Sequence, residues 1–149
     1  MRLKSRGVIA LAAAVLLAAG GAISAQSAEK YMARLAWVPI SGADRANVTG
    51  KGSATATLSG SKLAVTGSFE GLAASATAAR IHQGVAKGAR GPAIGDLVIT
   101  KGTSGTISGG LALDKEQLES LKQGRLYIQV HSEKGVAPDG SSLWGWFLR

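Results

Sequence analysis

The chain has 149 residues and a formal net charge of +8, with 21 glycines, two histidines and no cysteine. Without cysteine it can form no disulfide, cysteine zinc site or cysteine nucleophile, and two histidines exclude any site built on three. The glycine content disfavours a helical bundle, because a glycine inside a helix costs about 1 kcal/mol relative to alanine.

The N-terminal segment has the layout of a secretory signal peptide. Basic side chains within the first six residues precede an uncharged apolar run, 8–19, which is shorter than the roughly 20 residues of a membrane span. Small residues at 22–28 then offer cleavage sites. We expect a signal peptide over 1–28 and one exported domain, periplasmic or secreted, over 29–149. No transmembrane segment would remain after cleavage; an uncleaved anchor is the alternative.

Eight segments of the remaining chain combine alternating apolar residues with flanking turn residues, which is typical of β-strands. These segments are 31–38, 50–58, 62–69, 77–82, 94–100, 106–113, 125–131 and 142–148. The second and third are separated only by Ser-Gly-Ser, which predicts a hairpin. Short strands with regular turn signals favour an all-β domain over a parallel sheet.

One short helix interrupts the strands. Asp114 can cap its N-terminus, and Gln117 three residues later completes a capping box. Leu118 and Leu121 share one helical face, and Gly124 fits the position just past the end. We therefore expect an antiparallel Greek-key β-sandwich of seven or eight strands, with this helix as a short crossover.

Three passages resemble the CHRD (chordin-type) domain family. Residues 79–84 (ARIHQG) are similar to its A-H-I-H-x-G, and residues 126–132 (LYIQVHS) to its L-Y-V-N-V-H-T. Residues 138–140 (PDG), with Leu143 and Gly145 beyond them, are similar to P-x-G-E-I-R-G. The resemblance covers nearly the whole exported chain. It implies a secreted β-sandwich and no settled biochemical activity.

The chain also departs from that family pattern. Arg80 replaces the first histidine, while Ser142 and Trp144 stand where an acidic and a basic residue are usual. A fainter similarity links the chain to Cu/Zn superoxide dismutase, in which His82 and His131 would match two copper ligands and Arg80 would occupy a third. The sequence holds no counterpart of the bridging histidine, so the resemblance does not support the redox enzyme.

The candidate ligand-binding residues are Arg80, His82, Tyr127, His131 and Trp144. Within this set, His82 and His131 are the candidate copper or zinc ligands, because neutral imidazole is a common metal ligand. In the alternative interpretation, both histidines are structural and their ring nitrogens bond nearby loops. We favour that alternative, because Arg80 places a fixed positive charge beside the metal position.

Other chemistry finds little support in the sequence. The carboxylates of Asp114, Glu116 and Glu119 fall on or near the helix, and no carboxylate pair is placed for acid–base catalysis. Lys87 and Arg90 form the densest basic cluster, in the loop 84–92, and suit a polyanion or a glycan. The basic residues are otherwise scattered and aromatic residues are few, so nucleic acid is not an expected partner.

The last strand carries bulky residues on both faces. Trp144 and Trp146 share one face, while Leu143 and Phe147 share the other with Gly145 between them. We expect at least one face to pack in the core. An exposed Trp144 would suit contact with a glycan or a protein, because rigid aromatic side chains anchor such interfaces.

Taken together, these features predict an exported, non-catalytic binding or structural protein without a cofactor. Its partner would be a protein, a glycan or a small ligand. Two alternatives remain open: a periplasmic copper- or zinc-binding protein with a degenerate superoxide-dismutase-like histidine site, and a binder of polyanions or glycans.

Overall fold

Eight antiparallel strands form the domain in a computed structural model that describes residues 27–149. The strands are β1 (Glu29–Trp37), β2 (Lys51–Ser59), β3 (Lys62–Glu70), β4 (Ala76–Gln83), β5 (Ala93–Ile99), β6 (Gly105–Ala112), β7 (Leu126–Val136) and β8 (Ser141–Trp146). A 3-10 turn (Gly42–Asp44) follows β1, and helix α1 (Lys115–Lys122) joins β6 to β7. The predicted all-β antiparallel fold with one short helix is confirmed. Residues 1–26 of the predicted signal peptide lie outside the described residues.

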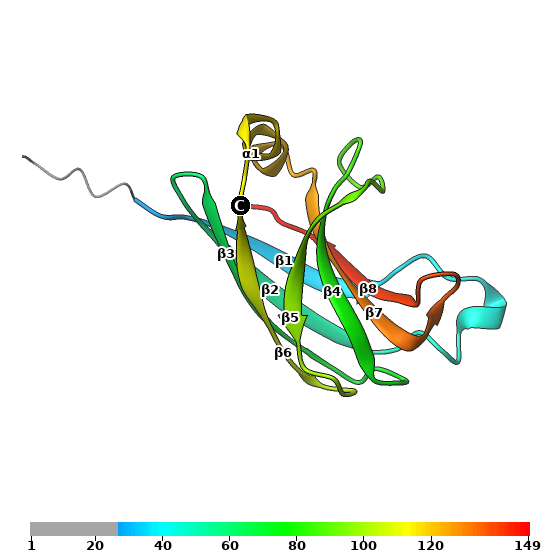
Figure 1. The fold of residues 1–149 in the computed structure, drawn as a ribbon. Helices are drawn as coiled ribbons and strands as arrows, with labels where there is room; N and C mark the ends of the chain where they lie inside the picture. The colour runs from blue at the N-terminus through cyan, green and yellow to red at the C-terminus, as the bar shows by residue number, and fades with distance from the viewer. Residues whose placement is uncertain (1–26) are drawn as a thin grey trace, which may run out of the picture.

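The strands close into one barrel in the order β1-β2-β3-β6-β5-β4-β7-β8 (Figure 1). Strands β4, β5 and β6 form a meander whose last strand lies beside β3, which is a Greek-key arrangement. The prediction of a sandwich is therefore corrected to a closed barrel. Alternation along a strand shows which residues face inward, but it does not show whether the first and last strands pair.

Closure depends on two short seams. Strand β5 pairs with β6 only at Val98 and Ile99, and β1 pairs with β8 only at Ala36 and Trp37. An isolated bridge between Met32 and Leu148 extends the β1–β8 seam. The barrel therefore consists of two four-stranded sheets, β1-β2-β3-β6 and β5-β4-β7-β8, which are joined by few residue pairs.

The core consists of the inward-facing residues of all eight strands. Its most buried members include Leu35, Ala56, Val65, Ile81, Ile107, Ile128, Leu143 and Phe147. Burial of this apolar surface is the main stabilising contribution to the fold. The last strand packs one face in the core, as expected. Leu143 and Phe147 face the core, so Trp144 and Trp146 face outward.

Helix α1 covers one end of the barrel (Figure 1). The predicted capping box is present, because Asp114 Oδ1 accepts from the Gln117 amide at 2.8 Å and Gln117 Oε1 accepts from the Asp114 amide at 3.0 Å. Leu121 is fully buried against the core, and Gly124 takes a positive φ of 70° just past the helix. Among residues 27–149, no helix is long and apolar enough to span a membrane.

Candidate functional site

Strands β4, β7 and β8 bring the predicted site residues onto one outward face of the barrel. Strand β7 lies between the other two, with Tyr127 opposite His82 on β4 and opposite Trp146 on β8. Gln129 is opposite Arg80 on one side and Trp144 on the other. We call the side chains of His82, Tyr127, Gln129, His131, Trp144 and Trp146 the outer layer. All five residues predicted from the sequence lie in this layer or, in the case of Arg80, at its edge.

Aromatic stacking joins one half of the outer layer. The Tyr127 ring stacks on His82 and on Trp146, each with a centroid distance of 4.9 Å. Trp144 meets Tyr127 edge-on at 6.0 Å and Trp146 at 4.6 Å. Tyr127 is only 1% exposed, although it lies on the outside of the barrel. Offset and edge-on contacts of this kind stabilise aromatic clusters and restrict their side-chain rotation.

The loop 84–92 folds over this aromatic half and holds it in place. His82 Nδ1 lies 2.9 Å from the carbonyl oxygen of Gly91, and the Gly91 amide donates to the Tyr127 hydroxyl at 3.2 Å. The guanidinium of Arg90 lies 5.0 Å from the ring centre of Trp144, in a cation–π contact. A side chain on Gly91 would meet the Gln83 carbonyl oxygen at 1.7 Å, so glycine permits this close approach.

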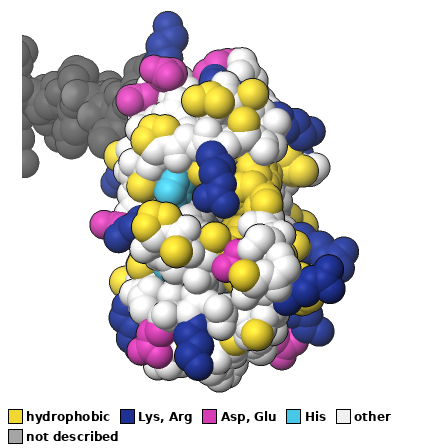
Figure 2. Space-filling view, turned by 90° about the vertical axis from the view of Figure 1, so that its right-hand side faces the viewer, with side chains coloured by type: hydrophobic (Ala, Val, Ile, Leu, Met, Phe, Trp, Pro, Cys, Tyr) yellow, Lys and Arg dark blue, Asp and Glu magenta, His cyan; other side chains and the backbone are white. Residues whose placement is uncertain are grey.

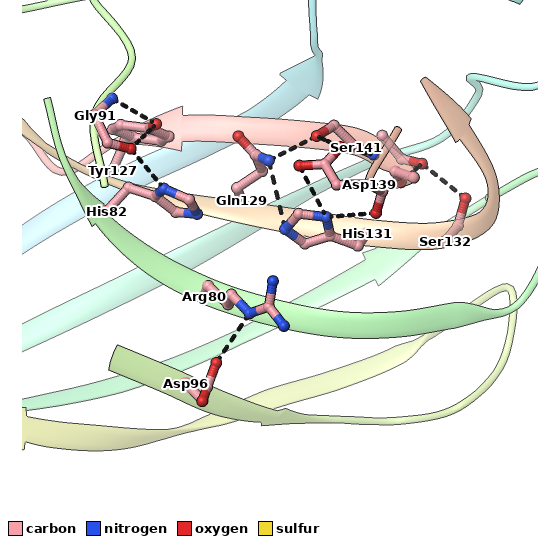
Figure 3. A network of polar contacts seen from close by, with 12 residues as sticks. Arg80, His82, Gly91, Asp96, Tyr127, Gln129, His131, Ser132, Asp139 and Ser141 are labelled. Carbon is pink, nitrogen blue, oxygen red and sulfur yellow. Dashed lines mark hydrogen bonds and ion pairs between the residues drawn. The ribbon is translucent and has the colours of Figure 1, made fainter. Parts of the chain in front are cut away.

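A polar network fills the other half of the outer layer (Figure 3). His131 Nδ1 lies 3.0 Å from the carbonyl oxygen of Asp139. Because a carbonyl oxygen only accepts, Nδ1 carries the proton, and Nε2 can accept from Gln129 Nε2 at 3.4 Å. Gln129 also donates to Ser141 Oγ at 2.7 Å. Gln129 and His131 are each 2% exposed, so these two side chains are closed to solvent, whereas Asp139 is exposed at the edge of the network.

Two acceptor atoms of the outer layer have no hydrogen-bond partner among the described residues. They are His82 Nε2 and Gln129 Oε1, and both are buried. Nδ1 of His82 donates to the Gly91 carbonyl, so Nε2 is the lone-pair nitrogen of a neutral ring. Burial lowers the pKa of His82; the hydrogen bond to the Gly91 carbonyl opposes this shift, and the nearby charge of Arg80 adds to the lowering.

The lowered pKa of His82 predicts a loss of stability in mild acid. As pH falls below the ordinary histidine value of 6.5, the unfolded state takes up the proton first, so the free energy of unfolding decreases until the folded pKa is reached. Urea denaturation between pH 7.5 and 5 measures this slope. The variant His82→Gln is expected to flatten it, whatever its stability at pH 7.5. Equal slopes in the two proteins would show that His82 does not carry the effect.

The two histidines do not fit a shared copper or zinc site. His131 lies four residues beyond Tyr127, the partner of His82, which is about 13 Å along the strand. Each Nδ1 bonds the carbonyl of a different loop, and Arg80 adds a positive charge in the same region (Figure 3). Within residues 27–149, no group of three or more His, Cys, Asp or Glu residues is placed to hold a metal ion.

Exposure divides the predicted residues into two groups. Tyr127 and His131 are buried, so they cannot contact a ligand from solvent without movement of the layer. Arg80 is paired with Asp96 through a contact of 3.0 Å, yet 44% of its side chain is exposed. Trp144 is partly exposed. Tyr127 packs edge-on against Trp144 and so positions it, while His82 is half-buried beside Tyr127.

A groove runs beside the outer layer, between β8 and β1. It has a volume of about 470 Å³ and is lined mainly by Met32, Arg34, Ala36, Trp144, Trp146 and Leu148. Trp146, Met32 and Arg34 were not among the candidate residues predicted from the sequence, although Trp146 was placed on the same face as Trp144. A signal was available, because Met32 and Arg34 alternate with inward-facing residues of β1. Figure 2 shows hydrophobic side chains next to Lys or Arg side chains and a histidine on one side of the molecule.

Comparison with known proteins gives one match. The profile of the CHRD domain matches residues 38–140. No curated protein and no solved structure matches the chain significantly. The matched segment contains His82, Tyr127 and His131, but it ends before Trp144 and begins after β1.

Proposed function

Because the chain belongs to the CHRD domain family, we propose that it is an exported, non-catalytic binding protein whose contact surface is the exposed side of Trp144 and Trp146. Membership of this family suggests a binding or structural role with an unidentified partner. The basic and apolar segment at the start of the chain supports export to the periplasm or the exterior.

One observation carries the choice of surface. Tyr127 packs against both Trp144 and Trp146, Arg90 lies over the Trp144 ring, and both tryptophans line the same groove. An aromatic side chain that is already held in one rotamer loses little conformational entropy when a ligand binds. Partly exposed, rigid tryptophans beside a groove are the features expected of a binding surface.

The polar half of the outer layer supports the non-catalytic part of the proposal. It places Ser141, Asp139 and His131 close together, which are the residue types of a nucleophilic triad. However, Ser141 Oγ donates to Asp139 Oδ1 at 2.6 Å and makes no hydrogen bond with the His131 ring in the described chain. Ser141 is also 1% exposed. A substrate could not reach this hydroxyl, and the imidazole is not placed to take its proton.

A binding screen with matched variants tests the proposal. Tryptophan fluorescence is followed during titration with neutral hexasaccharides of xylose and glucose, hexagalacturonate, an unstructured decapeptide, Cu²⁺ and Zn²⁺. We expect at least one organic probe to bind and to be recovered unchanged. Trp144→Ala should weaken that binding about tenfold or more. Val98→Ala should leave it unchanged, because Val98 is an exposed apolar side chain on β5, away from the groove.

Three outcomes would reject the proposal. The first is that no organic probe binds, and the second is that Trp144→Ala binds as tightly as the unaltered protein. The third is metal binding that His82→Ala and His131→Ala both abolish, which would favour the alternative of a copper- or zinc-binding protein.

A further inference from the structure

The groove between β8 and β1 has an apolar wall that the fold leaves exposed. Met32 is 68% exposed and Leu148 is 41% exposed, although both are large apolar side chains. They lie next to Trp144 and Trp146 in the lining of the groove. Adjacent exposed apolar side chains of this size are typical of an interaction site.

The backbone edges of β1 and β8 in this groove are already hydrogen-bonded to each other. The Met32 and Leu148 backbones exchange two hydrogen bonds, of 2.7 and 2.9 Å, at one end of the groove, and Ala36 pairs with Trp144 at the other. A side chain on Gly145 would meet the Arg34 carbonyl oxygen at 2.4 Å, so the two backbones also approach closely in the middle. An extended peptide could therefore not add a strand here, because that mode needs a free edge.

Within residues 27–149, Arg34 is the one charged residue in the lining of the groove. The outward positions of β1 carry Lys30 and Arg34, and the described strands β2 and β8 contain no Asp or Glu within their bounds. Lys51 on β2 is already paired with Glu70 at 3.3 Å. Within residues 27–149, Arg34 makes no side-chain hydrogen bond or ion pair, although its side chain lines the groove. The groove therefore combines an aromatic wall with an unpaired guanidinium.

We propose that this groove binds a linear glycan that carries uronate carboxylates. The C–H faces of the sugar rings would pack on Trp144 and Trp146, and a carboxylate would accept two parallel hydrogen bonds from Arg34. Lys30 would add attraction at longer range. The inference rests on the proposed binding function and names its ligand class. Neither the tryptophans nor Arg34 lies in the segment that matches the family profile.

Nucleic acid is the other anionic chain that this groove could attract. Arg90 lies over one face of the Trp144 ring and Tyr127 stacks on one face of Trp146, so each indole has only its opposite face left for a ligand. The indole rings of Trp144 and Trp146 also meet at 69° and form a corner, not a flat platform. This geometry suits the puckered face of a sugar better than the plane of a base.

Isothermal titration calorimetry with hexagalacturonate, xylohexaose and an oligo-dT decamer tests the ligand class. We expect hexagalacturonate to bind about tenfold more tightly than xylohexaose, and more tightly than oligo-dT. Arg34→Gln should weaken hexagalacturonate binding and so remove most of this preference. Lys62→Gln is the matched control, because it removes one exposed positive charge on β3, away from the groove. Trp144→Ala should weaken both saccharides.

The outcomes separate this inference from the function on which it rests. Equal affinity for hexagalacturonate and xylohexaose, or equal effects of Arg34→Gln and Lys62→Gln, would overturn the acidic glycan and leave the binding surface intact. Tighter binding of oligo-dT would also overturn it. If Trp144→Ala changes no affinity, the binding surface itself is rejected, together with the ligand assigned to it.

Discussion

Replacement of Tyr127 by alanine is expected to lower the free energy of unfolding by about 3–5 kcal/mol. The Tyr127 ring is 1% exposed and stacks on both His82 and Trp146, so its removal leaves a cavity that no single neighbour can fill. The loop 84–92 would also lose its contact with the Tyr127 hydroxyl. Urea denaturation monitored by circular dichroism measures the loss.

Tyr127→Phe separates the ring from the hydroxyl. It keeps both stacking contacts and removes only the bonds to Gly91, so it should cost about 1 kcal/mol. If Tyr127→Ala costs no more than Tyr127→Phe, the aromatic half of the outer layer does not stabilise the fold. The interpretation of Tyr127 as a positioning residue would then be wrong.

Replacement of Gly145 by alanine is expected to lower the free energy of unfolding by about 2–3 kcal/mol. The added Cβ would lie 2.4 Å from the Arg34 carbonyl oxygen and 2.9 Å from its carbon, and backbone atoms cannot move aside as a flexible side chain can. Strand β1 would be pushed from β8 at a seam that has few pairs to lose. Thermal or urea unfolding measures the effect.

Gly42→Ala provides the matched control for that variant. A Cβ at Gly42 meets nothing within 4 Å, so the same substitution there should leave stability unchanged or raise it by less than about 1 kcal/mol. Equal effects of the two substitutions would mean that close packing of β8 against β1 does not determine the response at Gly145.

The strands were predictable because each carries its own pattern. In β3, for example, Leu63, Val65 and Phe69 are buried while the residues between them are mostly exposed, and the turn beside the strand is marked by glycine. The capping residues Asp114 and Gln117 likewise identify α1 from local chemistry alone. Closure of the barrel is a property of strands far apart in the sequence, and no local pattern specifies it.

The sequence predicted which residues form the candidate site, but not that several of them are buried. The resemblance placed Arg80, His82, Tyr127 and His131 together, and the pairing of β4 with β7 does bring them onto one face. The burial of Tyr127 and His131 depends on the loop 84–92 and on Asp139, which fold back over the face. A strand whose polar face lies under a loop shows the same alternation of polar and apolar residues as a strand whose polar face meets solvent.

The division between buried and exposed residues also explains how the chain can depart from its family pattern. Trp144 replaces a position where the family usually has a basic residue, and Arg90 from the loop supplies a guanidinium directly above it. Trp144 lies outside the segment that matches the CHRD profile, whereas Arg90, His82, Tyr127 and His131 lie within it.

Chemical-shift mapping of the purified protein tests the binding surface most directly. Its three tryptophans each give a separate indole N–H signal in a ¹H–¹⁵N spectrum. During titration with the tightest ligand of the screen, we predict that the signals of Trp144 and Trp146, and the backbone amides of β8 and β1, shift with a single dissociation constant while those of β3 and β6 stay in place. Shifts confined to other strands, or no shift at saturating ligand, would contradict the account.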